Sequence, residues 1–342
     1  MSPARDSGMP FSMRTLDIDA ETEVSRIVSA LRAQVRDATR KRGLVLGLSG
    51  GIDSSVCAAL AARTVGPRNV FCLFMPENDS DPESLRLGQL VANEFDLKGA
   101  VEDIGPTLEA MGCYARRDAF IRQVEPDYGL GWSSKIVIAN ALTTGGYNIC
   151  SLVVRDPRGE MRKHRLPAQV YLGIVAATNM KQRTRKQIEY YHADRLNHAV
   201  VGTPNRLEYD QGFFVKNGDG AADVKPIAHL YKSQVYQLAA HLGVPEAVRR
   251  RTPTTDTYSL AQTQEEFYFA LPYDKMDLCL YGLNNKVPAA QVAQAASLTE
   301  DQVAAVWSDI AAKRKVARYL HLPAQLVEQV EGAASTDGQA RQ

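Results

Sequence analysis

The segment with the clearest chemical potential is LGLSGGIDSSV, at residues 46–56. An apolar run ends there in a Gly- and Ser-rich turn that opens a helical pattern, so backbone N–H groups and a helix N-terminus would face an anion such as phosphate. Asp53 stands out, because its carboxylate repels phosphate unless a cation such as Mg²⁺ lies between them. The turn therefore predicts a magnesium–nucleotide loop, and the alternative is a turn that merely opens a helix.

Two widespread nucleotide motifs are absent from this segment. No Lys follows the glycines, as the GxxxxGK[ST] phosphate loop would require, and the glycines lack the GxGxxG spacing of dinucleotide-binding folds. The loop must therefore hold phosphate through its amides, through the hydroxyls of Ser49, Ser54 and Ser55, and through a metal ion.

Short apolar runs and helical patterns alternate on both sides of this loop. We expect buried strands at residues 44–48, 69–74, 100–104 and 198–202. We expect helices at 18–42, 52–63, 82–96, 179–197 and 233–242, two more within 289–320, and a β-hairpin of strands 147–154 and 161–166. Strands that alternate with helices predict an α/β fold, a doubly wound parallel sheet of the Rossmann-like kind with flanking helices.

The composition is that of an ordinary globular protein and gives the chain no strong overall charge. Its 342 residues are 45% apolar and 23% charged, and 40 Lys and Arg nearly balance 39 Asp and Glu. This balance argues against a nucleic-acid or membrane partner. We find no apolar run long enough for a membrane span, and five scattered cysteines without metal spacing indicate a reducing cytoplasm.

The string SGGIDSS after an apolar strand resembles the pyrophosphatase-type ATP loop, whose enzymes cleave ATP between the α- and β-phosphates and leave AMP on the substrate. Later segments, in order, make the chain similar to the NAD synthases, a family with the adenine nucleotide alpha hydrolase type of fold. The similar segments are MPENDSDPES at 75–84, NMKQRTR at 179–185, GTPNRLE at 202–208, GFFVKNGDGAADVKPI at 212–227, PTTD at 253–256 and KRK at 313–315.

The resemblance implies a role for each residue that matches a family motif. Asp53 and Glu208 would bind Mg²⁺, and Asp53, Thr203 and Lys232 would form the catalytic set. Lys232 would neutralise charge on the departing pyrophosphate. The residues implied to bind ATP are Gly47, Leu48, Ser49, Gly50, Gly51, Asp53, Ser54, Ser55, Met75, Thr203, Lys232 and Thr254, and those implied to contact the deamidated dinucleotide are Arg183, Lys216, Asp223 and Lys313.

The implied reaction is the amidation of deamido-NAD to NAD, with ATP as co-substrate and ammonia as nitrogen donor. No segment looks like a glutaminase, so ammonia would arrive free or from a separate partner protein. The resemblance also implies a homodimer. We expect a single domain at residues 16–325 with an atypical insertion at about 112–172, between disordered ends at 1–15 and 326–342.

The sequence departs from the family pattern near the expected acceptor pocket. The string TYSLAQTQEEFYFALPY follows Asp256, Pro204 replaces a residue with a backbone N–H, and Ala312 stands where many members have His. Two other hypotheses therefore stay open at this stage. One is an ATP-dependent amide ligase that acts on a different carboxylate, and the other is a binding protein without catalytic activity.

Overall fold

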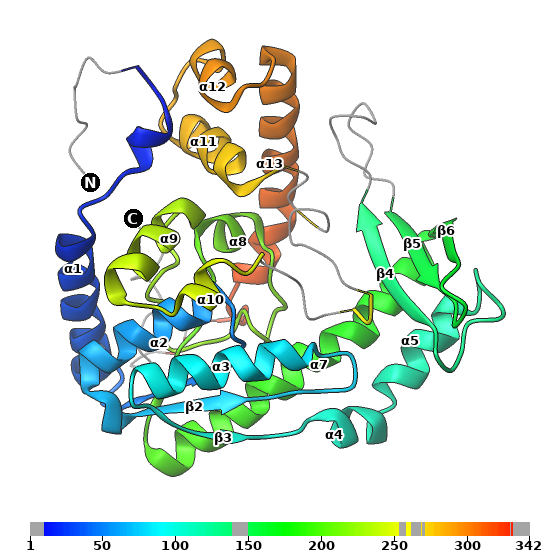
Figure 1. Ribbon diagram of the computed structural model, residues 1–342, viewed down its shortest axis with the longest axis horizontal. Helices are drawn as coiled ribbons and strands as arrows, with labels where there is room; N and C mark the ends of the chain where they lie inside the picture. Colours follow the sequence, from blue (N-terminus) through cyan, green and yellow to red (C-terminus); the bar gives the residue numbers. More distant parts are fainter. Residues whose placement is uncertain are drawn as a thin grey trace.

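A four-stranded parallel sheet forms the centre of the computed structural model, which describes residues 10–138, 150–252, 258–260, 268, 271–328 and 330. The strands are β1 (Leu44–Gly47), β2 (Val70–Phe74), β3 (Lys98–Val101) and β7 (Ala199–Val200), in the order β3-β2-β1-β7. All three neighbouring pairs are parallel. The predicted α/β fold is confirmed, although β3 begins and ends earlier than the predicted strand at 100–104 (Figure 1).

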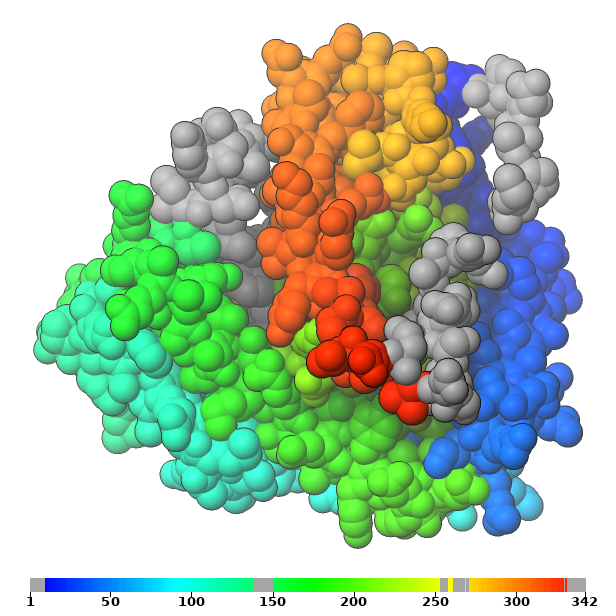
Figure 2. Space-filling view, turned by 180° about the vertical axis from the view of Figure 1, so that it is seen from behind, coloured from blue at the N-terminus to red at the C-terminus, as the bar shows by residue number. Residues whose placement is uncertain are grey.

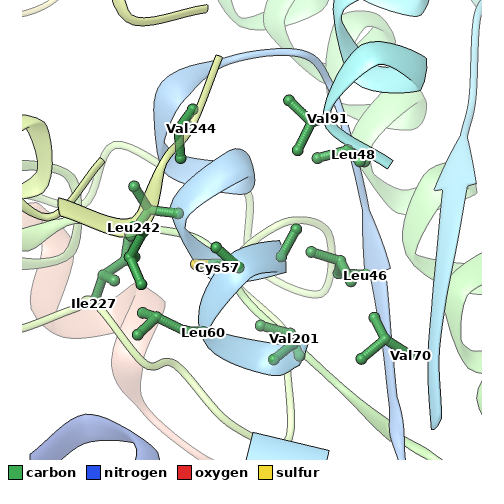
Figure 3. Packing of buried hydrophobic residues seen from close by; sticks show 14 of the residues in the cluster. Leu46, Leu48, Cys57, Leu60, Val70, Val91, Val201, Ile227, Leu242 and Val244 are labelled. Carbon is green, nitrogen blue, oxygen red and sulfur yellow. The ribbon is translucent and has the colours of Figure 1, made fainter. Parts of the chain in front are cut away.

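Helices cover both faces of this sheet because successive strand side chains point to opposite sides. Leu44 and Leu46 belong to the main core together with α2, whereas Val45 packs with Ala193 of α7 on the other face. Figure 3 shows Leu46, together with Cys57 and Leu60 of α2, within this cluster of buried residues. The helices of the two faces are α1 (Ala20–Ala33), α2 (Ile52–Val65), α3 (Pro82–Glu94) and α9 (Lys232–Leu242) on one side and α7 (Ala168–Leu196) on the other.

A second, antiparallel sheet lies beside the N-terminal half of α7. Its strands are β4 (Ser133–Ile138), β5 (Cys150–Arg155) and β6 (Met161–Arg165), in the order β4-β5-β6. The predicted hairpin is confirmed as β5 and β6, and β4 was not predicted. Ile136, Leu152 and Val154 of this sheet pack against Val170 and Ile174, and α7 accordingly begins at Ala168 rather than at the predicted start near residue 179.

Three C-terminal helices form a further apolar cluster above the parallel sheet (Figure 1). They are α11 (Tyr273–Asn284), α12 (Ala289–Ala296) and α13 (Glu300–His321), so the two helices predicted within 289–320 are confirmed. Leu16, the first residue of the predicted domain, is fully buried in this cluster at the end of the 3₁₀-helix Met13–Leu16, which begins within the end predicted to be disordered at 1–15. Figure 2 shows the residues after α13, in red, lying against the green middle of the chain.

The remaining described elements are short or connect the layers. They are η2 (Gln34–Ala38), η3 (Pro67–Asn69), α4 (Gly105–Ala110), α5 (Cys113–Ile121), α8 (Arg206–Gln211) and α10 (Glu246–Arg249). No helix within the described ranges combines the length and the apolar content needed to cross a bilayer.

Candidate active site

The carboxyl ends of β1 and β7 mark the point where the strand order of the parallel sheet reverses. From β1 the chain runs to β2 and β3 on one side, and it later returns to place β7 on the other side. Open α/β sheets bind ligands in the crevice at such a point. A cavity of about 810 Å³ opens there, and Gly47, Ser49 and Thr203 contribute to its walls. Its volume is within the range of small-molecule sites.

The glycine-rich loop keeps a defined shape through its own hydrogen bonds. The hydroxyls of Ser54 and Ser55 donate to the Gly51 carbonyl at 3.1 and 2.8 Å, and Ser49 Oγ lies 3.1 Å from Ser54 Oγ. Gly50 has a φ of +72°, and a Cβ there would lie 2.5 Å from the Ser84 carbonyl oxygen. Only glycine therefore fits between the loop and α3.

Most, but not all, of the predicted loop residues face the cavity. Those that line it are Gly47, Leu48, Ser49, Gly51, Asp53, Ser54 and Met75. Gly50, Ser55 and Lys232 are absent from the lining: Gly50 packs against the α3 backbone, and the side chains of Ser55 and Lys232 are fully buried. Gly50 and Ser55 shape the loop instead of touching the cavity, and Lys232 lies behind the lining, against Asp53. Thr254 lies outside the described residues.

Asp53, at the start of α2, is the centre of a polar cluster that joins three segments of the chain. Asn205 Nδ2 donates to Asp53 Oδ1 at 3.1 Å, and Lys232 Nζ forms an ion pair with Asp53 Oδ2. Asn205 also begins α8, where its side chain accepts from Glu208 N while Glu208 Oε2 accepts from Asn205 N. This capping box fixes the Glu208 carboxylate beside Asp53.

Burial makes the charges of this cluster depend on one another. Burial, and then the charge of Asp53, raise the pKa of Glu208 to about 8. Burial opposes the charge on the fully buried Lys232, but the carboxylates of Asp53 and Glu208 outweigh it and raise the pKa of Lys232. Two carboxyl groups thus share one ammonium group, and an additional cation beside them would favour the ionised form of Glu208.

The donor set of the cluster suits Mg²⁺. Asp53 and Glu208 offer carboxylate oxygens, and the described residues contain no group of three or more His, Cys, Asp or Glu that could hold a metal alone. Mg²⁺ typically takes one or two carboxylates and completes its shell with water and substrate phosphate oxygens. A pair of acidic side chains beside a phosphate-binding type of loop matches this typical coordination.

Helix α7 forms another part of the cavity wall. Lys186 and Glu189 line it and are paired with each other at 2.6 Å, and burial raises the pKa of Glu189. The Glu189 carboxylate lies directly against the backbone of Gly47. Aromatic side chains complete the wall: Tyr171, Phe213, Phe214, Tyr258 and Tyr268. No sequence pattern selects Lys186 or Glu189, because a charged pair three residues apart on a helix is usually solvated.

The four residues implied to contact the dinucleotide lie outside the cavity lining. Arg183 and Asp223 are exposed, and Asp223 Oδ2 accepts from Val200 N at 2.7 Å. Lys216 Nζ donates to the carbonyls of Tyr319 and Leu322, and Lys313 is paired with Asp309 at 2.7 Å. The chain therefore does not gather these four side chains around the cavity.

Two functional candidates were missed by the sequence analysis. Asn205 joins Asp53 to Glu208, and its capping-box spacing before Glu208 was a readable signal. Arg251 lines the cavity and donates to Asp81 and Ser84 at 3.1 and 3.0 Å, which ties the end of α10 to the start of α3. No local sequence pattern predicts that contact.

Comparisons with known proteins agree with this geometry. The family model described as NAD synthase matches residues 23–124 and 156–321. A protein of Rhizobium meliloti (strain 1021), named NH(3)-dependent NAD(+) synthetase, is 75% identical over 321 residues, which cover 94% of this chain and 96% of the relative. A Thermotoga maritima protein with the same name is 33% identical over 242 residues, 71% of this chain and 80% of that protein.

Solved structures support the fold. The NMN synthetase of Francisella tularensis matches with a TM-score of 0.63 at 21% identity, over 91% of this chain and 99% of its own. The NH3-dependent NAD synthetase of Campylobacter jejuni matches with a TM-score of 0.58 at 21% identity, over 91% of this chain and all of its own. The family match covers most of the chain, and it includes both the glycine-rich loop and the segment with Asn205 and Glu208. The protein belongs to the NAD synthase family.

Proposed function

We propose that this protein is an ammonia-dependent NAD synthase, which uses ATP to convert the nicotinate carboxylate of deamido-NAD into the amide. The main observation that supports the proposal is the cluster of Asp53, Glu208 and Lys232 next to the glycine-rich loop. Close relatives named as NH(3)-dependent NAD(+) synthetases support the same reaction. An ATP-dependent ligase for another carboxylate has no comparable support.

The reaction needs two displacements. The nicotinate carboxylate attacks the α-phosphorus of ATP, the bond to pyrophosphate breaks, and an acyl adenylate forms. Ammonia then attacks the acyl carbon and AMP leaves. The adenylate is already activated, so no protein nucleophile is required, and the protein contributes through positioning and electrostatic stabilisation.

Different residues would bind the phosphates, hold the metal ion and stabilise the leaving group. The amides of the loop and the N-terminus of α2 bind phosphate oxygens, while Thr203 adds a hydroxyl from the neighbouring strand end. Asp53 and Glu208 would hold Mg²⁺, which when bound supplies positive charge to the phosphate oxygens. Lys232, whose buried ammonium group is paired with Asp53 beside the loop, would stabilise the charge that builds on departing pyrophosphate.

We also propose that the protein acts as a homodimer. Arg183 and Asp223 are exposed and lie outside the cavity lining, and they would contact a dinucleotide held partly by a second subunit. A cytoplasmic location is supported by the five cysteines, all of which are unpaired. Ammonia arrives free or from a separate partner.

A reconstituted reaction tests the proposal. The protein is incubated with ATP, Mg²⁺ and ammonium, together with deamido-NAD, with nicotinate mononucleotide or without acceptor, and AMP and NAD are measured. Equal amounts of AMP and NAD, formed only with deamido-NAD, are expected. Asp53→Ala should abolish ATP–pyrophosphate exchange, and Asp37→Ala, at an exposed site, should not. AMP release that ignores deamido-NAD would overturn the assignment.

A further inference from the structure

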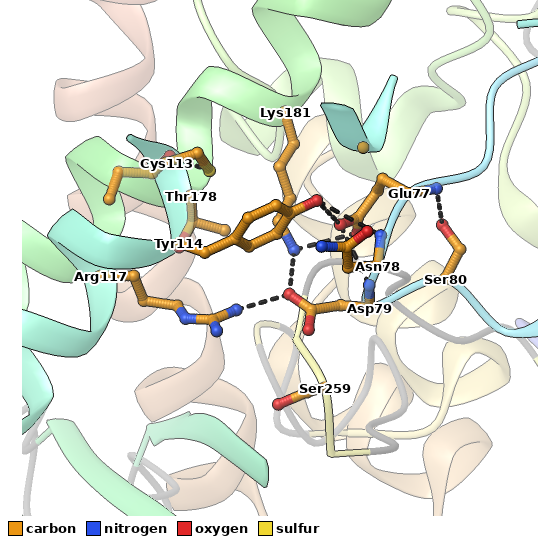
Figure 4. A network of polar contacts seen from close by, with 12 residues as sticks. Glu77, Asn78, Asp79, Ser80, Cys113, Tyr114, Arg117, Thr178, Lys181 and Ser259 are labelled. Atoms are coloured by element: carbon orange, nitrogen blue, oxygen red, sulfur yellow. Dashed lines mark hydrogen bonds and ion pairs between the residues drawn. The ribbon is translucent and has the colours of Figure 1, made fainter. Parts of the chain in front are cut away.

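A buried network of four charged side chains lies next to the cavity but outside the cluster around Asp53 (Figure 4). Lys181 of α7 donates to Glu77 Oε1 at 3.0 Å and to Asp79 Oδ2 at 2.5 Å. Arg117 of α5 pairs with the same Asp79 oxygen at 2.5 Å. Two cations and two anions thus compensate one another in a place where an unpaired charge would be costly.

All four of these side chains are largely removed from solvent. The side chains of Glu77 and Lys181 are 0% and 2% exposed, and those of Asp79 and Arg117 are 9% and 10% exposed. Burial disfavours the ionised form of Asp79, but the charges of Lys181 and Arg117 outweigh it and hold the pKa of Asp79 below its usual value. The pairing therefore favours the ionised form of Asp79.

The network fixes the backbone of one loop, residues 75–81, which follows β2. Tyr114 of α5 donates to Glu77 Oε2 at 2.8 Å and accepts from Asn78 N at 3.3 Å. Glu77 Oε2 accepts from Asp79 N at 3.1 Å, and Ser80 Oγ accepts from Glu77 N at 3.1 Å. The amides of this short loop are thus bound by side chains that α5 and α7 hold in place.

The same loop forms part of the cavity wall. Met75, Pro76, Glu77, Ser80 and Asp81 all line the cavity that contains the glycine-rich loop. Arg117 and Tyr114 do not line it, so neither would touch a nucleotide bound there. Their contacts reach the cavity only through Asp79, Glu77 and Asn78.

We propose that Arg117 is a positioning residue for nucleotide binding: through Asp79 it holds loop 75–81 in its cavity-lining conformation before any nucleotide arrives. Lys181 supports the same loop from α7, and Tyr114 adds a weaker contact to Glu77. The structural part of this inference depends only on the network. Its kinetic part rests on the proposed function, because it requires ATP to bind in the cavity.

Hydrogen–deuterium exchange of the peptide that covers residues 75–84 tests the structural part without any turnover. In Arg117→Met, Asp79 keeps Lys181 as a partner, so the protein should fold. Loss of a buried hydrogen bond to a charged group should speed exchange of this peptide by roughly tenfold. The matched control is Arg116→Met, the exposed neighbour on α5, which should leave exchange unchanged. Arg117→Lys should restore part of the protection.

Nucleotide binding tests the kinetic part. Saturating ATP should restore slow exchange in Arg117→Met, and the KM for ATP should rise severalfold while kcat stays nearly constant, because part of the binding energy is used to order the loop. Tyr114→Phe should give the same changes at smaller size, which provides a second test if Arg117→Met folds poorly. The inference is overturned if exchange of 75–84 stays at the wild-type rate. It is also overturned if β2 exchanges equally faster, or if KM does not move.

Discussion

Replacing Lys232 by Met tests the electrostatic account of the site most directly. The substitution keeps the length and apolar character of the side chain and removes only its charge and its hydrogen bonds. Lys232 Nζ is fully buried and pairs with Asp53, so its loss leaves two neighbouring carboxylates with no ammonium group between them. Both stability and catalysis should respond, for separate physical reasons.

The effect on stability can be bounded from the contacts of Asp53. Removing one partner of a buried ion pair typically lowers the free energy of unfolding by about 3–5 kcal/mol. Asp53 keeps the hydrogen bond from Asn205 at 3.1 Å, and its side chain is 16% exposed. We therefore expect a loss somewhat below that range, about 1–3 kcal/mol, in metal-free buffer.

The effect on catalysis should be larger than the effect on ATP binding. A preorganised charge that stabilises a transition state contributes about 10²–10³ in kcat. Pyrophosphate exchange in Lys232→Met should fall by that factor, while the KM for ATP changes less. Lys98→Met, at an exposed position of β3, is the matched control and should behave as wild type.

Denaturation with and without Mg²⁺, in the absence of nucleotide, separates this reasoning from a simple packing defect. In Lys232→Met the unpaired carboxylates should gain more from Mg²⁺ than they do in the wild type, so the metal should restore part of the lost stability. The reasoning is refuted if Mg²⁺ stabilises both proteins equally, or if pyrophosphate exchange is unaffected by the substitution.

Three further outcomes are expected. Gly50→Ala should lose ATP binding and should lower the free energy of unfolding more than Gly243→Ala does. Both positions have positive φ, but a Cβ at Gly50 would meet the Ser84 carbonyl oxygen, whereas one at Gly243 meets open space. Equal losses of unfolding free energy would contradict this. Asn205→Ser should keep the α8 cap and its stability to within about 1 kcal/mol while pyrophosphate exchange falls, since only the amide bound to Asp53 is lost; unchanged exchange would contradict this. Burial raises the pKa of Asp277 to about 6, above the unfolded value of about 3.9. Between these two pH values the folded state binds more protons than the unfolded state. The free energy of unfolding should therefore fall as pH rises through 6, by up to about 3 kcal/mol. Asp277→Asn should flatten that slope in denaturant titrations at pH 4–7, and an unaltered slope would contradict it.

Local patterns predicted the strands and helices that carry the loop, because each of these elements has its own strong signal. An apolar run, two glycines and an Ala-rich helix are enough to place β1, the loop and α2. The start of α7 was wrong for the opposite reason. Its first turns contain Gly173, Ile174 and Val175, which are poor helix formers. Gly173 is required there because the ring of Phe120 lies where a Cβ would be.

Contacts between distant segments set the rest of the site, and no local pattern contains them. Asn205 meets Asp53 across 152 residues, and Lys232 meets it across 179. The family resemblance selected Asp53, Glu208 and Lys232, but only the structure shows that the lysine pairs with the carboxylate. The resemblance alone had assigned Lys232 to ATP phosphates.

This pairing has a consequence for the order of events at the site. Under the proposed function, a divalent cation held by Asp53 and Glu208 would compete with Lys232 for the Asp53 carboxylate, whose other oxygen already accepts from Asn205. The attraction between Asp53 and the Lys232 ammonium group would then weaken when triphosphate brings new negative charge to the site. Because Lys232 is fully buried, its charge would act at low dielectric, where attraction to an anion is strongest. Pairing with Asp53 lets the free protein keep this desolvated cation without leaving it unpaired.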